Sequence, residues 1–127
     1  MAWASVVASE EQEQDNLIQW WDRQCRVWGL PSFALYHVGN EGSGNAIRGA
    51  RLKRMGVRAG CPDLLLDVPT GRYHGLRIEM KRRKGGRVSP QQREFLEYLE
   101  SRGYAVAVCY GWDEARAVIQ DYLRGAG

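Results

Sequence analysis

The sequence predicts an α/β fold in which helices flank a mixed central sheet, and three patterns support this expectation. Apolar residues recur at helical spacing near the N-terminus, two apolar runs flank a turn-rich segment, and a further apolar run lies between two helical patterns. The chain has 127 residues, of which 44% are hydrophobic, so it is long enough to bury one core. We expect a single domain over residues 1–127, with residues 1–8 as a flexible N-terminal segment.

The N-terminal half is expected to contain two helices and a strand. The first helix covers residues 9–28, where apolar side chains recur at helical spacing: Leu17, Ile18, Trp21 and Cys25. Residues 33–38 are expected to form a strand, 39–44 a glycine-rich loop and 46–55 a helix with a basic face. The Gly-x-Gly of the loop lacks the other residues of a nucleotide-binding motif, so we expect no nucleotide cofactor.

The C-terminal half reads as helix, strand and helix. Ser89 is a good helix N-cap, Pro90 suits the first turn, and Gln92 is placed to close a capping box. Gly103 is a plausible end for this helix. Residues 104–110 are apolar on both faces and are expected to form a central strand, after which a last helix follows.

Two carboxylates are expected to meet in the middle of the chain. The apolar runs on either side of residues 69–75 suggest a hairpin, and symmetric folding about Gly71 would place Asp63 opposite Glu79. Lys81 would share a face with Glu79, with their Cα atoms roughly 7 Å apart. Asp63, Glu79 and Lys81 are therefore expected to converge.

Such a trio suits hydrolysis of a phosphodiester with a divalent cation. Close carboxylates repel each other unless a proton or a cation lies between them. Because no Cys or His cluster is nearby, Mg²⁺ or Mn²⁺ is a better fit than zinc, and the Met80 carbonyl is expected to complete the ligands. Lys81 would orient a water or offset charge on the phosphate. The alternative is a solvated strand face, which suits an isolated Glu-x-Lys better than one with Asp63 opposite.

Basic residues cluster on both sides of the expected hairpin, although the net charge is only +3. They are Arg48, Arg51, Lys53, Arg54 and Arg58 before it, and Arg82, Arg83, Lys84 and Arg87 after it. A nucleic acid is the polyanion that such clusters attract, and no base-reading motif accompanies them. We expect contacts to the DNA backbone, with a solvated loop and helix face as the alternative. His37 and Asn40 could touch the substrate or be structural.

Several segments resemble one family of nucleases. Pro62-Asp63 with Glu79-Met80-Lys81 resembles the PD-(D/E)XK motif, and residues 37–42, 52–60 and 85–92 narrow the resemblance to the VRR-NUC domain. It implies a restriction-endonuclease-like αβββαβ core and standalone bacterial or phage-encoded relatives. It also implies that Asp63 and Glu79 bind metal and that Lys81 is the catalytic lysine.

The resemblance further implies a metal-site glutamate on the first helix and a site glutamine at the start of the helix after the motif. Gln92 matches the glutamine, although its capping role would explain it equally well. Glu10, Glu11 and Glu13 all lie near the start of the first helix, so the choice among them stays open, with Glu10 and Glu13 preferred.

We therefore expect a Mg²⁺- or Mn²⁺-dependent DNA endonuclease that prefers branched DNA such as four-way junctions or flaps. One alternative is a non-catalytic basic module that recognises branched DNA within a larger complex, and another is a metal-binding domain acting on small phosphorylated substrates. The clustered tryptophans, and Trp20 in particular, suggest a homodimer interface, with burial in the monomer core as the alternative. No membrane segment or signal peptide is expected, and the cytoplasm is the expected location.

Overall fold

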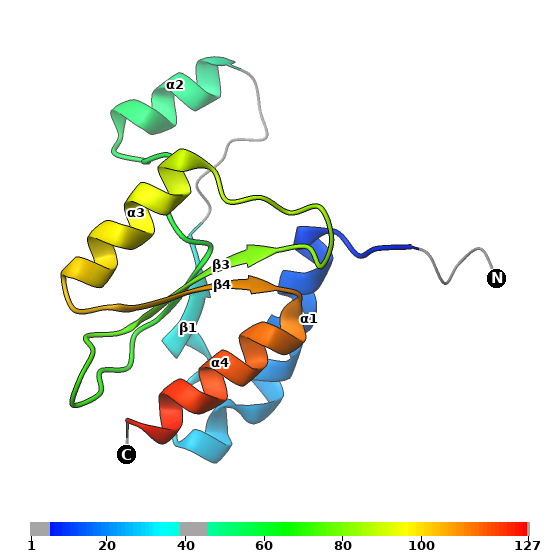
Figure 1. Cartoon of the computed structure of the whole chain (residues 1–127), viewed down its shortest axis with the longest axis vertical. Coiled ribbons are helices and arrows are strands. Elements are labelled where there is room, and N and C mark those ends of the chain that lie inside the picture. Colours follow the sequence, from blue (N-terminus) through cyan, green and yellow to red (C-terminus); the bar gives the residue numbers. More distant parts are fainter. Residues whose placement is uncertain (1–5, 39–45, 127) are drawn as a thin grey trace.

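The computed structural model describes residues 6–38 and 46–126 (Figure 1). Within these ranges the elements are, in chain order, α1 (Glu10–Gln24), the short 3₁₀ helices η2 (Cys25–Trp28) and η3 (Ser32–Ala34), β1 (Leu35–His37), α2 (Ala46–Arg54), β2 (Leu64–Leu66), β3 (Leu76–Lys81), α3 (Pro90–Ser101), β4 (Ala105–Tyr110) and α4 (Trp112–Arg124). The structure confirms the expected α/β class: four strands form one sheet flanked by helices.

The sheet is mixed, as expected, with strand order β1-β2-β3-β4. The first three strands pair antiparallel, whereas β3 and β4 pair parallel. The central position predicted for residues 104–110 is wrong, because β4 lies at one edge of the sheet in the described part of the chain and β3 is internal. Helices α3 and α4 both pack on β4 and lie on opposite sides of it, which explains why it is apolar on both faces (Figure 1).

The hairpin register was predicted correctly. Leu64 pairs with Ile78 and Leu66 with Leu76, so the two strands are symmetric about residue 71. The same register places Asp63, which directly precedes β2, opposite Glu79 on β3. The parallel connection through α3 then brings the start of that helix to the same end of the sheet, next to Lys81.

Helix α1 begins with a capping box, in which Gln12 N donates to the Ser9 hydroxyl at 3.1 Å and Ser9 N donates to the Gln12 side chain at 2.9 Å. Leu17 and Trp21 are fully buried, and Trp20 is only 8% exposed. The expectation that Trp20 reaches a partner protein is therefore wrong, since it packs in the monomer core. Trp3, another of the clustered tryptophans, lies outside the described residues.

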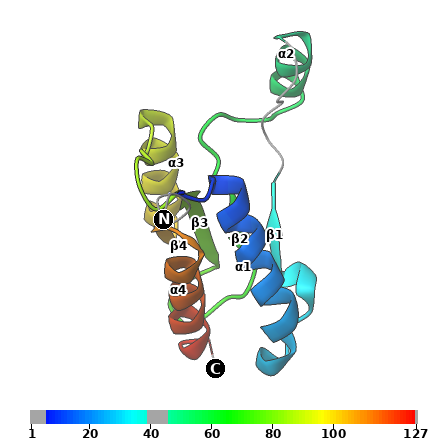
Figure 2. The ribbon, with the colours of Figure 1, turned by 90° about the vertical axis from the view of Figure 1, so that its right-hand side faces the viewer.

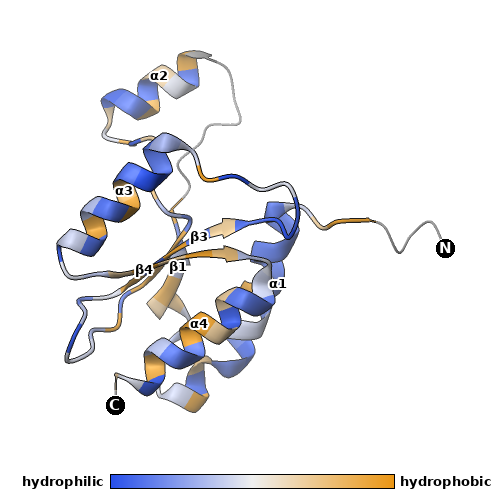
Figure 3. Cartoon of the chain, in the orientation of Figure 1, coloured by the Kyte–Doolittle hydropathy of each residue, from blue (hydrophilic) through white to orange (hydrophobic). Residues whose placement is uncertain are grey.

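Hydrophobic residues concentrate on the strands (Figure 3), and residues of α1 and α4 complete the buried core. The most deeply buried side chains of the sheet include Leu64, Leu66, Ile78 and Met80. None of the three cysteines, all of which lie in the described ranges, forms a disulfide, and Cys25 and Cys109 are buried. No helix of the described ranges is both long and apolar enough to cross a membrane.

Helix α2 stands apart from this core. Both views show it beyond the end of the sheet (Figures 1 and 2). The segment after it returns to the core at Gly60, where a Cβ atom would come within 2.6 Å of the Gln91 backbone. Gly60 also has a φ of +86°, so a larger residue there would be strained as well as blocked.

Candidate active site

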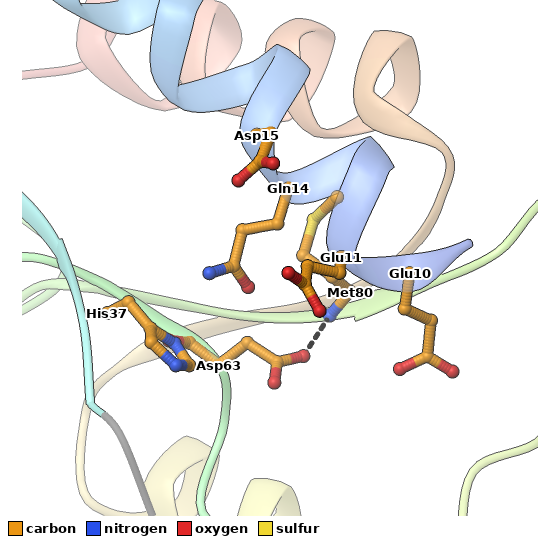
Figure 4. Close-up of a pocket in the computed structure, with 7 residues that line it drawn as sticks. All are labelled: Glu10, Glu11, Gln14, Asp15, His37, Asp63 and Met80. Carbon is orange, nitrogen blue, oxygen red and sulfur yellow. Dashed lines mark hydrogen bonds between the residues drawn. The ribbon is translucent and has the colours of Figure 1, made fainter. Parts of the chain in front are cut away.

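Asp63 and Met80 meet where β2 begins. The Met80 amide donates a hydrogen bond of 2.7 Å to Asp63 Oδ2, which fixes this carboxylate beside β3 (Figure 4). In a strand, the amide and the carbonyl of one residue point to the same side. The Met80 carbonyl is therefore directed toward the β2 side, as the expected ligand role requires.

Next to it, the buried side chains of Glu79 and Lys81 form a polar cluster with the half-buried Gln92. Gln92 Nε2 donates to Glu79 Oε2 at 2.9 Å, and Lys81 Nζ donates to Gln92 Oε1 at 3.0 Å. Lys81 Nζ also lies 3.7 Å from Glu79 Oε2. The glutamine closes the capping box of α3 at the same time, because its Oε1 accepts from Ser89 N at 2.9 Å. The capping role of Gln92 is therefore confirmed, and its side chain also contacts the carboxylate of Glu79, while its role in the active site stays a prediction.

Glu79 is placed as a cation ligand would be. Its side chain is 2% exposed, and its Oε1 is a buried atom without a hydrogen-bond partner. Burial and the neighbouring Asp63 carboxylate raise the pKa of Glu79 to about 8, and the attraction of Lys81 offsets only part of this. A buried, unpartnered oxygen beside a second carboxylate therefore suits a divalent cation.

The ligand set is small. Among residues 6–38 and 46–126, no three His, Cys, Asp or Glu side chains form a ready metal-binding group. Asp63, Glu79 and the Met80 carbonyl nevertheless suit Mg²⁺, which commonly binds one or two carboxylates and keeps several waters.

The raised pKa of Glu79 leads to a stability prediction for the protein without metal. Between the ordinary pKa of 4.5 and the folded pKa of about 8, the folded state binds more protons than the unfolded state. The free energy of unfolding should therefore fall as pH rises through this window, by up to about 1.4 kcal/mol per pH unit. Urea denaturation in EDTA, compared with Glu79→Gln, isolates this slope. Parallel curves for the two proteins would show that Glu79 ionises normally.

An acidic pocket of about 430 Å³ opens between α1 and the start of β2 (Figure 4). It is lined by Glu10, Glu11, Gln14, Asp15, His37, Asp63 and Met80. Glu10 is thus on the same pocket as two of the expected ligands, and its charge also contributes to the raised pKa of Glu79. Glu11 lines the same pocket, so the structure separates both Glu10 and Glu11 from Glu13 and does not choose between the first two.

Glu13, the other preferred glutamate, is turned elsewhere. Its carboxylate is buried, with Oε2 3.1 Å from Arg83 Nε and Oε1 accepting from Trp112 N at 3.0 Å. Arg83 Nη2 also pairs with Asp113 Oδ1 at 2.8 Å. Because both carboxylate oxygens are engaged, the structure assigns Glu13 to packing and not to the metal site. Arg83 joins α1 to the start of α4 through these two ion pairs, and since its side chain is 44% exposed, its expected contact with DNA stays a prediction.

The other basic residues expected to touch DNA are exposed. They are Arg48, Arg51, Lys53, Arg54 and Arg58 on and after α2, and Arg82, Lys84 and Arg87 after β3. The second group lies in the segment that directly follows Lys81 at the end of β3, whereas most of the first is carried by the protruding helix. Asn40 lies outside the described residues.

His37 lies closer to the candidate active site than its position in the sequence suggested. Its Nδ1 lies 2.7 Å from the Asp63 carbonyl, and its ring lines the acidic pocket. A carbonyl only accepts hydrogen bonds, so Nδ1 is assigned as the protonated nitrogen. The signal available in the sequence was its position at the end of the strand that pairs with β2, but that pairing was not predicted.

Comparisons with known proteins agree with this geometry. The model of the VRR-NUC domain family matches residues 8–113. A solved structure described as a VRR_NUC domain protein is 36% identical, with a TM-score of 0.82, and the match covers 94% of this chain and 91% of that one. The comparison with curated proteins found no match.

Fold and site together define a nuclease domain of the PD-(D/E)XK type. The chain belongs to the VRR-NUC family, and its substrate is accordingly DNA.

Proposed function

We propose that the chain is a Mg²⁺-dependent endonuclease, with Mn²⁺ as a substitute, and that it acts on branched DNA. The observation that carries the proposal is Glu79, whose buried Oε1 has no partner although Asp63 lies opposite it. Leaving such an oxygen unpaired is costly, so its retention indicates a ligand that the protein binds. Asp63, Glu79, the Met80 carbonyl and Glu10 would hold the cation.

Mg²⁺, when bound, would polarise a phosphoryl oxygen and make a water more acidic. The residues of the chain supply the rest. Gln92 fixes the carboxylate of Glu79 and the ammonium of Lys81 at once, so neither has to be ordered when DNA arrives. Lys81, held in place, can donate to a phosphate oxygen on which negative charge develops.

The second candidate is a basic DNA-binding module without catalysis. The exposed cations after β3 would serve it equally well. It gives no role, however, to the buried carboxylate of Glu79 and the buried ammonium of Lys81, which Gln92 joins by hydrogen bonds and which are both expensive to desolvate. This cost favours the enzyme. The third candidate, action on small phosphorylated substrates, does not need the extended basic surface.

Branched DNA and pairing of two copies belong together in the proposal. One site cuts one strand, whereas resolving a four-way junction needs two cuts on strands related by symmetry. A two-fold dimer would supply both sites. We therefore propose that the active form is a homodimer.

Labelled four-way junctions and linear duplexes of matched sequence test the proposal. In Mg²⁺ the junction should be cut in pairs of symmetric strands, the duplex much more slowly, and neither in EDTA. Tight junction binding without cuts in Mg²⁺ or Mn²⁺ would favour the non-catalytic module. Equal cutting of junction and duplex would contradict the preference for branched DNA.

A prediction about binding follows from the loop after β3. Replacing both Arg82 and Lys84 with alanine should weaken metal-free DNA binding at all sequences and reduce the salt slope by about 1 to 2, because each phosphate contact adds roughly 0.9. Removing the same charge far from the site, with Arg102→Ala and Arg124→Ala, is the matched control. An unchanged slope in Arg82→Ala/Lys84→Ala would place the DNA elsewhere.

A further inference from the structure

One face of α2 is apolar, basic and exposed. Ile47 and Met55 are 80% and 73% exposed, and they recur at helical spacing with Arg51 between them. With Arg48 and Leu52, these residues line a shallow hollow of about 510 Å³. A nine-residue helix is marginal alone in water, and exposed apolar groups grouped on one face indicate a docking surface.

A second surface is complementary to this face. A groove of about 410 Å³ on α3 is lined by Ala59, Gln91, Glu94, Phe95 and Tyr98. Its wall is mainly aromatic, with Tyr98 58% exposed, and Glu94 adds a negative charge at the side. No residue of α2 lines this groove within the same chain. The apolar wall of the groove is therefore complementary to the apolar side chains of α2, and Glu94 is complementary to Arg51.

We propose that α2 of one copy docks into the α3 groove of a second copy. Ile47 and Met55 would pack on the aromatic wall, and Arg51 would pair with Glu94. The inference rests on the proposed homodimer, and two-fold symmetry would form the contact twice. DNA is less suited to this face of α2, because its phosphates would pair with the basic side chains and leave the apolar side chains exposed to water. Lys53, which lies on the opposite face of the helix, would stay available to DNA.

Charge reversal tests this contact. Arg51→Glu and Glu94→Arg should each weaken pairing at least about tenfold, because like charges would meet at both contacts. An equimolar mixture of the two variants should pair again, since each contact of the mixed dimer then joins opposite charges. Docking within one chain would not be rescued by mixing. Light scattering at micromolar protein measures the mass, and Lys53→Glu is the matched control that should leave it unchanged.

The mass of the wild type and of the variants distinguishes the possible arrangements. A wild-type dimer whose mass neither variant changes would overturn the contact and leave the pairing intact. A monomeric wild type would overturn both, while cleavage of linear DNA would still report on the nuclease assignment separately. Arg51→Glu that loses DNA binding at unchanged mass would make this face a DNA surface. Should a charge reversal unfold the protein, Met55→Ser, which removes only apolar contact, must weaken pairing for the proposal to stand.

Discussion

Asp63→Asn and Glu79→Gln are each expected to lower DNA cleavage at saturating DNA and Mg²⁺ by about a hundredfold or more. Each removes a charged oxygen from the proposed cation site. Lys81→Ala should lower the rate to a similar extent but have little effect on the Mg²⁺ concentration needed for cleavage. The reason is that Lys81 is proposed to stabilise negative charge on the phosphate and not to bind the metal. Single-turnover cleavage over a range of Mg²⁺ concentrations separates the two effects.

The matched control is Asp67→Asn, the same substitution at the other end of β2, where Asp67 pairs with Arg77 on the protein surface. Its cleavage should stay close to that of the wild type. Circular dichroism should show all four variants folded. Full cleavage by Asp63→Asn would falsify the assignment of the site.

Glu13 and Glu10 should separate stability from metal dependence. Glu13→Ala is expected to lower the free energy of unfolding by about 2 to 3 kcal/mol, because it leaves the part-buried Trp112 amide without its acceptor and breaks the pair with Arg83. Glu10→Gln should change stability by less than about 0.5 kcal/mol, since Glu10 is exposed, but should raise the Mg²⁺ concentration needed for cleavage.

Urea denaturation and a Mg²⁺ titration of cleavage measure the two effects on the same preparations. Glu13→Gln is a useful second variant, because it keeps an acceptor for the Trp112 amide and loses only the charge. If Glu13→Gln changed the metal dependence and Glu10→Gln changed the stability, Glu13 and not Glu10 would be the metal ligand.

The parts of the site that follow local rules could be predicted from the sequence. The turn-forming residues around Gly71 fixed the hairpin register, and alternation along a strand then placed Asp63, Glu79 and Lys81 together. The capping box of α3 could likewise be predicted from Ser89 and Gln92. In each case the interacting residues are close in sequence or related by one short turn.

The parts that depend on tertiary packing could not be predicted. Glu13 and Arg83 are 70 residues apart, and no local pattern distinguishes a clasp from a metal ligand or a DNA contact. Trp20 lies beside the apolar stripe of α1, but α1 packs against α4 and β3 in the fold, and Trp20 belongs to the buried core that results. A strand can be covered by helices on both faces whether it lies at the edge or at the centre of a sheet. The apolar composition of β4 therefore did not reveal that it is an edge strand.

The position of bound Mn²⁺ in a crystal tests the central claim most directly, because Mn²⁺ scatters anomalously and should replace Mg²⁺ at the same site. We expect an anomalous peak in contact with carboxylate oxygens of Asp63 and Glu79 and with the Met80 carbonyl oxygen, and no such peak in Asp63→Asn. A wild-type crystal with its Mn²⁺ bound elsewhere, from protein that cleaves DNA in Mn²⁺, would contradict the account.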